Sequence, residues 1–430
     1  MELTVSPVRT LKGEVSVPGD KSISHRALMF GGISQGETVV ENFLEGEDCL
    51  ATLACFKGLG VEVERIAPAK VKVLGKGLYG LSEPSDVLDA KNSGTTTRLI
   101  LGILAGQPFF SVVTGDASLR RRPMGRVTNP LRSMGAAIMG RKGGELAPLA
   151  IKGGDLHAIN YNSPVSSAQV KSSILLAGLY ARGETSVTEP ALSRDHTERM
   201  LEHFGAQVTR KGLTVTVKGQ PVLKAKDIYV PGDISSAAFL LVAACIVRNA
   251  EITIRGVGLN PTRTGILDAL RAMGARMEVV DTGSSGGEPF GDITVYSSVL
   301  TGTEIGGELI PRLIDEVPIL AVAAAYAEGR TVIKDAAELK FKESNRLQVM
   351  AEELGRLGAK IEELPDGLVI EGRSPLRGTN VGSHGDHRVA MALAVAGLAA
   401  KGDTTITQAD SIAVSFPGFV EMIQKLSDPV

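Results

Sequence analysis

Val17-Pro18-Gly19-Asp20 and Val230-Pro231-Gly232-Asp233 are two copies of one tetrapeptide, each following a β-branched stretch and preceding an apolar segment that contains serines. The first copy continues as Lys21-Ser22-Ile23-Ser24-His25-Arg26, whereas the second continues as the uncharged Ile234-Ser235-Ser236-Ala237-Ala238-Phe239. The repeat therefore predicts one structural joint used twice, and its cations predict binding chemistry at the first copy only.

Composition narrows the class of protein before any motif is considered. A chain of 430 residues with 43% hydrophobic content exceeds the size at which one core keeps growing, so we expect two domains. The net charge of −2, the absence of Trp and the aromatic content of 4% disfavour a polyanion or single-stranded nucleic acid as ligand. Three unpatterned cysteines fit a reducing compartment, and no signal or membrane span is evident, so we expect a cytoplasmic protein.

An Ala/Leu-rich helix, a Gly or Asn and a β-branched strand recur along the chain, which indicates an internal repeat. Five of the copies continue into a second helix that closes in a Gly suited to a left-handed C-cap, followed by another strand. The six strand entries begin at Gly36, Gly106, Gly183, Asn249, Gly329 and Gly402.

The sixth copy stops inside its second helix and lacks its last strand, which residues 3–17 could supply. The N-terminus then belongs with the C-terminal half, and the two tetrapeptides are the places where the chain passes between halves of three repeats each. We expect one domain over residues 21–232 and a second over residues 1–20 plus 233–430, with the active site in the cleft between them. A single solenoid of six stacked repeats is the alternative.

Donor-rich segments precede three apolar helices in the first half, and each could place free amides, hydroxyls and the positive end of a helix dipole at an anion. We expect Ser22 or Ser24 to cap the first helix, although a capped surface helix explains the same residues. The three segments are Lys21 to Arg26, Asn92 to Arg98, and Ser166 to Ser173.

Arg120-Arg121-Arg122 places three guanidinium groups side by side, which favours either a solvated face or a nucleic-acid patch. The neighbouring sequence lacks interleaved aromatics and further basic residues, which counts against the nucleic-acid reading.

In the second half, Lys342 and Arg346 are one helical turn apart, and Glu343 lies three residues before Arg346. Asp315 precedes an apolar helix, where it could act as a base or simply cap. Arg194-Asp195-His196 and His384-Gly385-Asp386-His387 raise a divalent metal as an alternative, but no carboxylate set with metal-ligand spacing accompanies them.

These segments together resemble the 3-phosphoshikimate 1-carboxyvinyltransferase (EPSP synthase) family over essentially the whole chain. The resemblance implies an α/β (α+β) fold, an inside-out α/β barrel of two domains with six βαβαββ repeats. It also implies that the domains close on the substrates, which excludes water. The matching segments are Pro18 to Arg26, Asn92 to Arg98, Arg122 to Gly125, Ser167 to Gln169, Lys342 to Leu347, Asp386 to Arg388, and Ala390 to Ala392.

The resemblance further implies transfer of the enolpyruvyl group of phosphoenolpyruvate to the 5-hydroxyl of shikimate 3-phosphate, without metal or other cofactor. Asp315 would take the hydroxyl proton, Glu343 would protonate the methylene carbon, and Lys21 would serve both substrates. Phosphoenolpyruvate would be bound by Lys21, Gly94, Arg122, Gln169, Arg346 and Arg388. Shikimate 3-phosphate would be bound by Lys21, Ser22, Arg26, Ser167, Ala168, Gln169, Arg194, Asp315 and Lys342.

The chain departs from the family pattern at several positions. Val414 stands where many members have a Lys, Ala168 replaces a frequent serine, and Glu338 stands where some have Asn. The related UDP-N-acetylglucosamine enolpyruvyl transferases carry Lys-Asn where this chain has Lys21-Ser22, and usually a loop Cys that the segment around Arg122 lacks. We expect a monomer that binds neither nucleic acid nor membranes.

Overall fold

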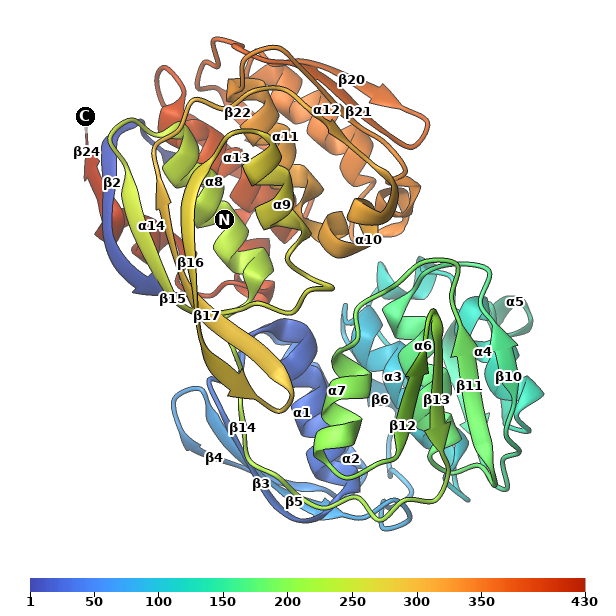
Figure 1. Cartoon of the computed structure of the whole chain (residues 1–430). Coiled ribbons are helices and arrows are strands. Elements are labelled where there is room, and N and C mark those ends of the chain that lie inside the picture. Colours follow the sequence, from blue (N-terminus) through green and yellow to red (C-terminus); the bar gives the residue numbers. More distant parts are fainter. Residues whose placement is uncertain (430) are drawn as a thin grey trace. The chain divides into compact units, whose positions relative to one another are not determined.

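The computed structural model describes residues 1–429, and the chain divides into two compact units (Figure 1). Unit 1 comprises residues 1–18, 231–283 and those from 289 onward, and unit 2 comprises residues 19–230 and 284–288. The chain passes from unit 1 to unit 2 between Pro18 and Gly19, and returns between Val230 and Pro231. Both of these passages lie inside a Val-Pro-Gly-Asp tetrapeptide, and the short segment 284–288 is the other place where the chain changes unit.

Each tetrapeptide ends in an aspartate that caps a helix. Asp20 Oδ1 accepts the Ile23 amide at 2.9 Å, and Asp233 Oδ1 accepts the Ser235 amide at 2.8 Å. The expected serine cap of the first helix is therefore wrong, because the aspartate of the tetrapeptide already occupies that position. Gly19 has no alternative, since a Cβ there would lie 1.9 Å from the carbonyl oxygen of Asn42.

Unit 2 contains three mixed sheets with the same topology, in which a parallel pair is extended by an antiparallel hairpin. In strand order, the sheets are β14 (Ile228–Tyr229), β3 (Gln35–Glu41), β5 (Lys70–Lys76) and β4 (Glu62–Ala67); β6 (Leu88–Asp89), β7 (Phe110–Thr114), β9 (Leu146–Lys152) and β8 (Ala137–Gly140); and β10 (Asn160–Asn162), β11 (Glu184–Thr188), β13 (Thr214–Lys218) and β12 (Val208–Lys211).

Unit 1 repeats this plan, with its N-terminal strands completing two of its three sheets. In strand order, the sheets are β16 (Arg276–Ser285), β17 (Glu288–Tyr296), β15 (Glu251–Gly258), β2 (Val8–Ser16) and β24 (Ser427–Pro429); β18 (Glu304–Ile305), β19 (Arg330–Ile333), β21 (Gly367–Glu371) and β20 (Lys360–Leu364); and β1 (Leu3–Val5), β23 (Thr404–Thr407) and β22 (Asn380–Gly382).

The strand missing from the sixth repeat comes from the N-terminus, but from fewer residues than the sequence predicted. β1 pairs antiparallel with β23, in the register Leu3 to Ile406. The longer strand β2 instead lies parallel to β15 and begins the fourth repeat. The N-terminal segment therefore serves two different sheets of unit 1.

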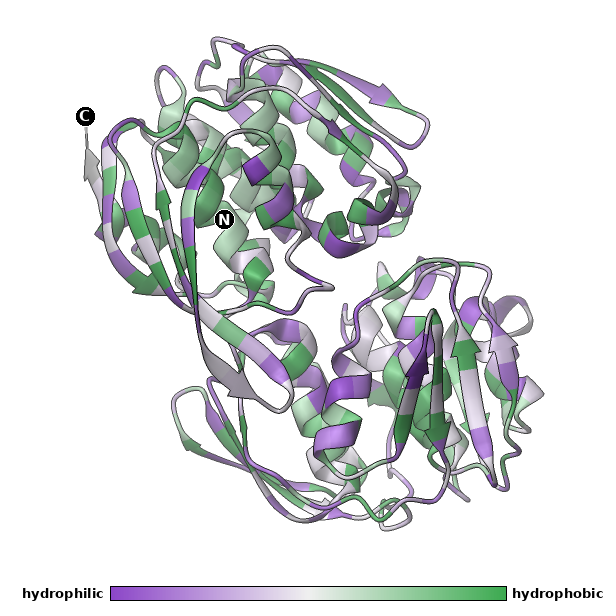
Figure 2. Ribbon diagram, in the orientation of Figure 1, coloured by the Kyte–Doolittle hydropathy of each residue, from purple (hydrophilic) through white to green (hydrophobic). Residues whose placement is uncertain are grey.

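Each repeat contributes one inner helix that is buried along nearly its whole length. A helix that is apolar on all faces must be enclosed by protein, and α8 illustrates this, with the hydrophobic colour over most of its length in Figure 2. The inner helices are α1 (Lys21–Ile33), α3 (Gly94–Ala105) and α6 (Ala168–Gly178) in unit 2, and α8 (Ile234–Ile246), α11 (Val317–Tyr326) and α13 (His387–Ala399) in unit 1.

Small residues allow the inner helices to approach closely. A Cβ at Gly102 of α3 would lie 2.2 Å from the carbonyl oxygen of Ser173 on α6, so only glycine fits there. The close contact holds the beginnings of α3 and α6 in a fixed relation, and both beginnings carry donor-rich segments.

The outer helices are amphipathic and pack between the inner helices and solvent. The predicted glycine caps are confirmed, because Gly60, Gly135, Gly205, Gly274 and Gly358 all have positive φ between 84° and 112°. The outer helices are α2 (Glu47–Gly58), α4 (Gly125–Ser133), α7 (His196–His203), α9 (Gly265–Ala272), α12 (Arg346–Arg356) and α14 (Phe419–Leu426), with short helices α5 (Arg141–Gly144) and α10 (Ile310–Leu313) in the connections. Among the described residues, no helix is both long and apolar enough to span a membrane.

Candidate active site

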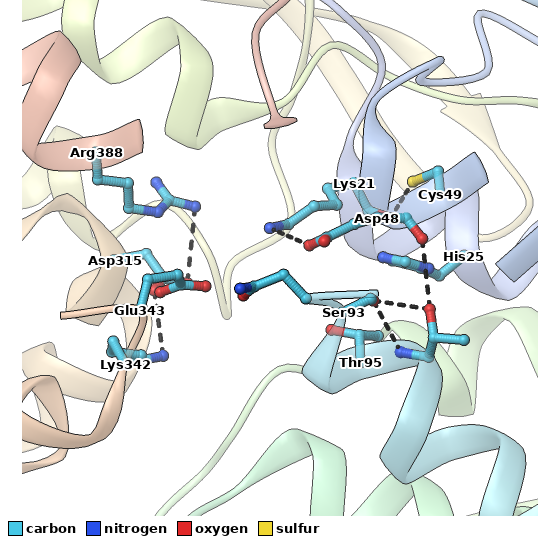
Figure 3. Close-up of polar contacts among 12 residues, drawn as sticks. Lys21, His25, Asp48, Cys49, Ser93, Thr95, Asp315, Lys342, Glu343 and Arg388 are labelled. Atoms are coloured by element: carbon cyan, nitrogen blue, oxygen red, sulfur yellow. Dashed lines mark hydrogen bonds and ion pairs between the residues drawn. The ribbon is translucent and has the colours of Figure 1, made fainter. Parts of the chain in front are cut away.

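The first helix of unit 2 carries a lysine held by a neighbouring carboxylate. Lys21 Nζ donates to Asp48 Oδ2 of α2 at 3.1 Å, with 16% and 9% of the two side chains exposed (Figure 3). A lysine on a flexible stem is a poor positioning group unless something fixes its ammonium. Asp48, which the sequence did not single out, supplies that restraint.

Arg26, one turn further along α1, is a buried cation whose hydrogen-bond acceptors are all neutral. Its guanidinium donates to Thr197 Oγ1 at 2.7 Å, the Ser22 carbonyl at 2.9 Å and Ser172 Oγ at 2.9 Å. Burial and the nearby charge of Arg194 lower the pKa of Arg26, the charges of Glu198, Asp20 and Glu288 oppose them, and the resulting pKa is about 10. A buried guanidinium that no described carboxylate contacts is suited to an anionic ligand.

The beginning of α3 brings together a glycine and two guanidinium groups. A Cβ at Gly94 would lie 3.1 Å from Arg98 Nη1 and 3.3 Å from Arg122 Nη1, so both cations pack directly against the glycine. Arg122 is 9% exposed and donates to the side-chain oxygen of Asn92. The helix is capped by Ser93, whose Oγ accepts the Thr96 amide at 3.1 Å. Glycine at this position therefore leaves room for a ligand beside paired cations.

Gln169 of α6 is joined to this group through both ends of its amide. Its oxygen accepts a hydrogen bond from Arg98, and its nitrogen donates to Thr95 Oγ1 at 3.0 Å. The sequence placed Arg98 inside a matching segment but gave it no role, and the structure makes it the link between α3 and α6. Of the Arg120 to Arg122 run, the first two side chains are exposed and only Arg122 turns inward.

The beginning of α6 differs from those of α1 and α3 because no side chain caps it. Its N-cap residue is Ser167, whose side chain makes no capping hydrogen bond. The Ser167 amide donates to Glu189 Oε1 at 2.9 Å, and helix α6 starts at Ala168. An uncapped helix start has amides available for an anion.

A second cluster lies in unit 1, around Asp315 in the 3₁₀ turn that precedes α11. Asp315 Oδ1 accepts from Lys342 Nζ at 3.2 Å and from Arg346 Nη1 at 3.1 Å, and its Oδ2 lies 3.9 Å from Arg388 Nη2. Figure 3 shows Asp315 between Lys342 and Arg388. The side chain of Asp315 caps neither the 3₁₀ turn nor α11, so the alternative prediction that this residue is a helix cap is wrong.

Arg346 is the centre of this cluster and is 2% exposed. It donates to Asp386 Oδ2 at 2.8 Å and to Glu343 Oε2 at 2.7 Å, in addition to Asp315. Burial opposes its charge, but the carboxylates of Asp386, Glu343 and Asp315 together raise the pKa of Arg346. The site thus holds a permanent cation next to the two predicted proton-transfer groups.

The predicted residues therefore form two clusters, one in each unit. Unit 2 brings together Lys21, Ser22, Arg26, Gly94, Arg122, Ser167, Ala168, Gln169 and Arg194, and unit 1 brings together Asp315, Lys342, Glu343, Arg346 and Arg388. Val414 lies half-buried at the end of a 3₁₀ turn in unit 1.

A histidine of each His/Asp segment lies within hydrogen-bonding distance of a carboxylate. His196 Nδ1 lies 2.8 Å from Glu288 Oε1, and His384 Nε2 lies 2.9 Å from Glu353 Oε1. Within residues 1–429, no group of three or more His, Cys, Asp or Glu side chains is arranged to hold a metal ion.

Comparison with known proteins identifies the family. The sequence model of the family EPSP synthase (3-phosphoshikimate 1-carboxyvinyltransferase) matches residues 5–423. The chain belongs to the EPSP synthase family. Its members are transferases, and the predicted family and α/β fold are thereby confirmed.

The relatives cover the chain almost completely. A 3-phosphoshikimate 1-carboxyvinyltransferase of Desulforamulus reducens is 60% identical over 426 residues, 99% of each chain, and one of Bacillus cereus is 57% identical over 427 residues, again 99% of each. The solved EPSP synthase of Acinetobacter baumannii has a TM-score of 0.89 and 46% identity, covering 99% of this chain and 98% of its own. The enolpyruvyl transferase NikO of Streptomyces tendae, with a TM-score of 0.80, 19% identity and the same coverage of 99% and 98%, shares the fold.

Proposed function

We propose that this chain transfers the enolpyruvyl group of phosphoenolpyruvate to the 5-hydroxyl of shikimate 3-phosphate, releasing phosphate. The observation that carries the proposal is the unit 1 cluster, where the carboxylates of Asp315 and Glu343 share contacts with the cation Arg346. Proton removal, proton delivery and stabilisation of a phosphate anion are the three tasks that this transfer requires. Full-length membership of the EPSP synthase family supports the same reaction.

The residues of the two clusters divide between the two substrates, and some of them serve both. We assign phosphoenolpyruvate to Lys21, Gly94, Arg122, Gln169, Arg346 and Arg388. We assign shikimate 3-phosphate to Lys21, Ser22, Arg26, Ser167, Ala168, Gln169, Arg194, Asp315 and Lys342. The assignment accords with the charge of the ligands, because each carries a phosphate and a carboxylate and so needs several positive groups.

The reaction proceeds by addition and elimination. The oxygen of the 5-hydroxyl attacks C2 of phosphoenolpyruvate while Asp315 accepts the hydroxyl proton. Glu343 delivers a proton to the methylene carbon, and the addition gives a tetrahedral ketal. Loss of a proton from the new methyl group and departure of phosphate restore the double bond in the product. Arg346, held by three carboxylates, is preorganised for the charge on the departing phosphate.

The function is tested by mixing the purified chain with phosphoenolpyruvate and shikimate 3-phosphate in the presence of EDTA and measuring phosphate release. We expect release that depends on both substrates and is insensitive to the chelator. Release with UDP-N-acetylglucosamine as acceptor, and none with shikimate 3-phosphate, would contradict the proposal and favour the related enolpyruvyl transferases. Light scattering of the same preparation checks the further proposal that the protein is a monomer.

A further inference from the structure

Unit 2 contains a lysine that is enclosed between two carboxylates away from solvent. Lys171 Nζ of α6 lies 2.9 Å from Glu189 Oε2 and 2.8 Å from Glu198 Oε1 of α7. The side chains are 1%, 3% and 1% exposed in that order. Both helices are labelled in Figure 1, and the proposed mechanism uses none of these three residues.

Glu189 connects two segments that carry candidate ligands of shikimate 3-phosphate. Its Oε1 accepts the amide of Ser167 at 2.9 Å, and its Oε2 accepts the hydroxyl of Ser193 at 2.8 Å. Lys171 Nζ also donates to the Ser193 carbonyl at 3.5 Å. Ser193 directly precedes Arg194, so Glu189 and Lys171 hold the beginning of α6 and the Arg194 segment in one arrangement.

A second hydrogen bond joins the same two segments. The Ala191 amide donates to Ser166 Oγ at 2.9 Å. Without Glu189, this bond would remain, but the Ser167 amide and the Ser193 hydroxyl would lose their common acceptor. The carboxylate therefore controls the residues nearest the proposed phosphate contacts.

Glu198 extends the arrangement toward Arg26. The next residue toward the N-terminus, Thr197, accepts a hydrogen bond from Arg26, and Ser172 Oγ lies 2.6 Å from Thr197 Oγ1. Glu198 is the strongest of the charges that favour the cationic form of Arg26. Its second oxygen is buried and has no hydrogen-bond partner in the described part of the chain, so this carboxylate is only partly satisfied by Lys171.

Stability alone does not account for three buried charges. Removing charged groups from water is costly, and well-packed apolar residues often give equal or greater stability than a buried ion pair. What the charged groups do supply is directed hydrogen bonding to a backbone amide and a hydroxyl, which apolar residues cannot provide.

We propose that Lys171, Glu189 and Glu198 form a positioning triad that holds Ser167 and Arg194 in place for the phosphate of the acceptor substrate. The triad thereby sets the preference for shikimate 3-phosphate over unphosphorylated shikimate. This inference rests on the proposed function, because it assumes that unit 2 binds the phosphorylated acceptor.

The test measures the dissociation constants of shikimate 3-phosphate and of shikimate by titration calorimetry for the wild type and for Glu189→Gln. The amide keeps one acceptor oxygen and the shape of the side chain but loses the charge. We expect the preference for the phosphorylated ligand to fall by about 10- to 100-fold, as for loss of a hydrogen bond to a charged group. The dissociation constant of shikimate itself should change by less than about threefold.

Two variants of Lys171 test the triad independently, in case Glu189→Gln impairs folding. Lys171→Met should reduce the preference in the same direction, and Lys171→Arg, which retains the charge, should restore most of it. Val217→Ala, which truncates a buried side chain of β13 in the same unit, is the control for lost stability and should leave the preference unchanged.

The outcomes separate this inference from the proposed function. If the wild type binds and converts shikimate 3-phosphate but Glu189→Gln and Lys171→Met both keep its preference, the triad is structural and the inference is wrong. Equal weakening of both ligands also overturns it, because the effect would then not concern the phosphate. If the wild type itself shows no preference for shikimate 3-phosphate, the proposed function fails first.

Discussion

Arg346 and Asp386 form a buried ion pair with two contacts, Nε to Oδ2 at 2.8 Å and Nη2 to Oδ1 at 3.3 Å, and their side chains are 2% and 0% exposed. Asp386 also accepts the Arg388 amide at 2.9 Å and the Ser344 hydroxyl at 3.0 Å. One carboxylate therefore holds the guanidinium of Arg346 and the backbone amide of Arg388, two of the three arginines that we assign to phosphoenolpyruvate. The motifs in the sequence assigned no binding or catalytic role to Asp386.

Replacing this carboxylate should be costly. Asp386→Ala leaves the Arg346 charge with one fewer partner and removes the cap of α13, so we expect the free energy of unfolding to fall by about 3–5 kcal/mol. Asp386→Asn keeps the helix cap, so its free energy of unfolding should fall by less than that of Asp386→Ala. Urea denaturation measures both, with Glu62→Ala, from an exposed pair with Lys76, as a control expected to stay within about 0.5 kcal/mol of wild type. A loss no larger than that of the control would contradict the role given to Asp386.

Gly94→Ala should discriminate between two ligands of the same site. The added methyl would stand 3.1 Å from Arg98 Nη1 and 3.3 Å from Arg122 Nη1, so both guanidinium groups must shift by a few tenths of an ångström. The family resemblance predicts that glyphosate competes with phosphoenolpyruvate, and we expect its inhibition constant to rise more than the KM of phosphoenolpyruvate.

Steady-state inhibition kinetics measure both constants. Gly355→Ala is the matched control, since a Cβ there meets only Ile361, at an ordinary 3.8 Å. Tighter glyphosate inhibition in Gly94→Ala would show that the space beside this glycine is not used by the inhibitor.

Asp315→Asn and Glu343→Gln should reduce turnover far more than binding. Each amide keeps the size of the side chain but cannot exchange the proton, so we expect kcat to fall by about 10²- to 10⁴-fold. Phosphate release gives kcat, and calorimetry gives the dissociation constants of the substrates. Glu352→Gln, an exposed carboxylate on α12, is the control. Either carboxylate would be removed from the mechanism by a variant with wild-type turnover.

Local sequence signals predicted most of the fold. Both Val-Pro-Gly-Asp crossings, the six repeated strand entries and the glycine caps depend on short-range preferences, such as positive φ and apolar periodicity, which a sequence displays directly. The N-terminal segment was predicted less well, because β1 has three residues and β2 pairs in a different sheet, and pairing partners are not visible in a strand's own sequence.

Motifs in the sequence predicted the candidate site residues, but they did not predict the carboxylates that hold those residues in place. Asp48 holds Lys21 from 27 residues away, and Asp386 holds Arg346 from 40 residues away. Glu189, directly after β11, likewise contacts Lys171 of the preceding helix α6. Such pairs form only when the repeats pack, so spacing along the chain carries no signal for them. Asp20 is the exception, since an aspartate directly before a helix is a recognisable cap that the neighbouring serines obscured.

His25 gives the fold a pH dependence whose sign can be derived. The ring is buried, its Nδ1 lies 2.6 Å from Thr52 Oγ1, and burial, with the charges of Lys21 and Arg26, lowers its pKa well below 6.5. In the unfolded chain the imidazole titrates near 6.5, so below that pH the unfolded state binds a proton that the folded state rejects. Stability must therefore fall as the pH drops, by up to about 1.4 kcal/mol per pH unit from this group.

Urea denaturation between about pH 5 and about pH 7 gives the slope of the unfolding free energy against pH. This slope should be shallower for His25→Asn than for wild type, whereas His157→Asn, at an exposed position, should keep the wild-type slope. An unchanged slope in His25→Asn would mean that the buried ring accepts a proton without unfolding.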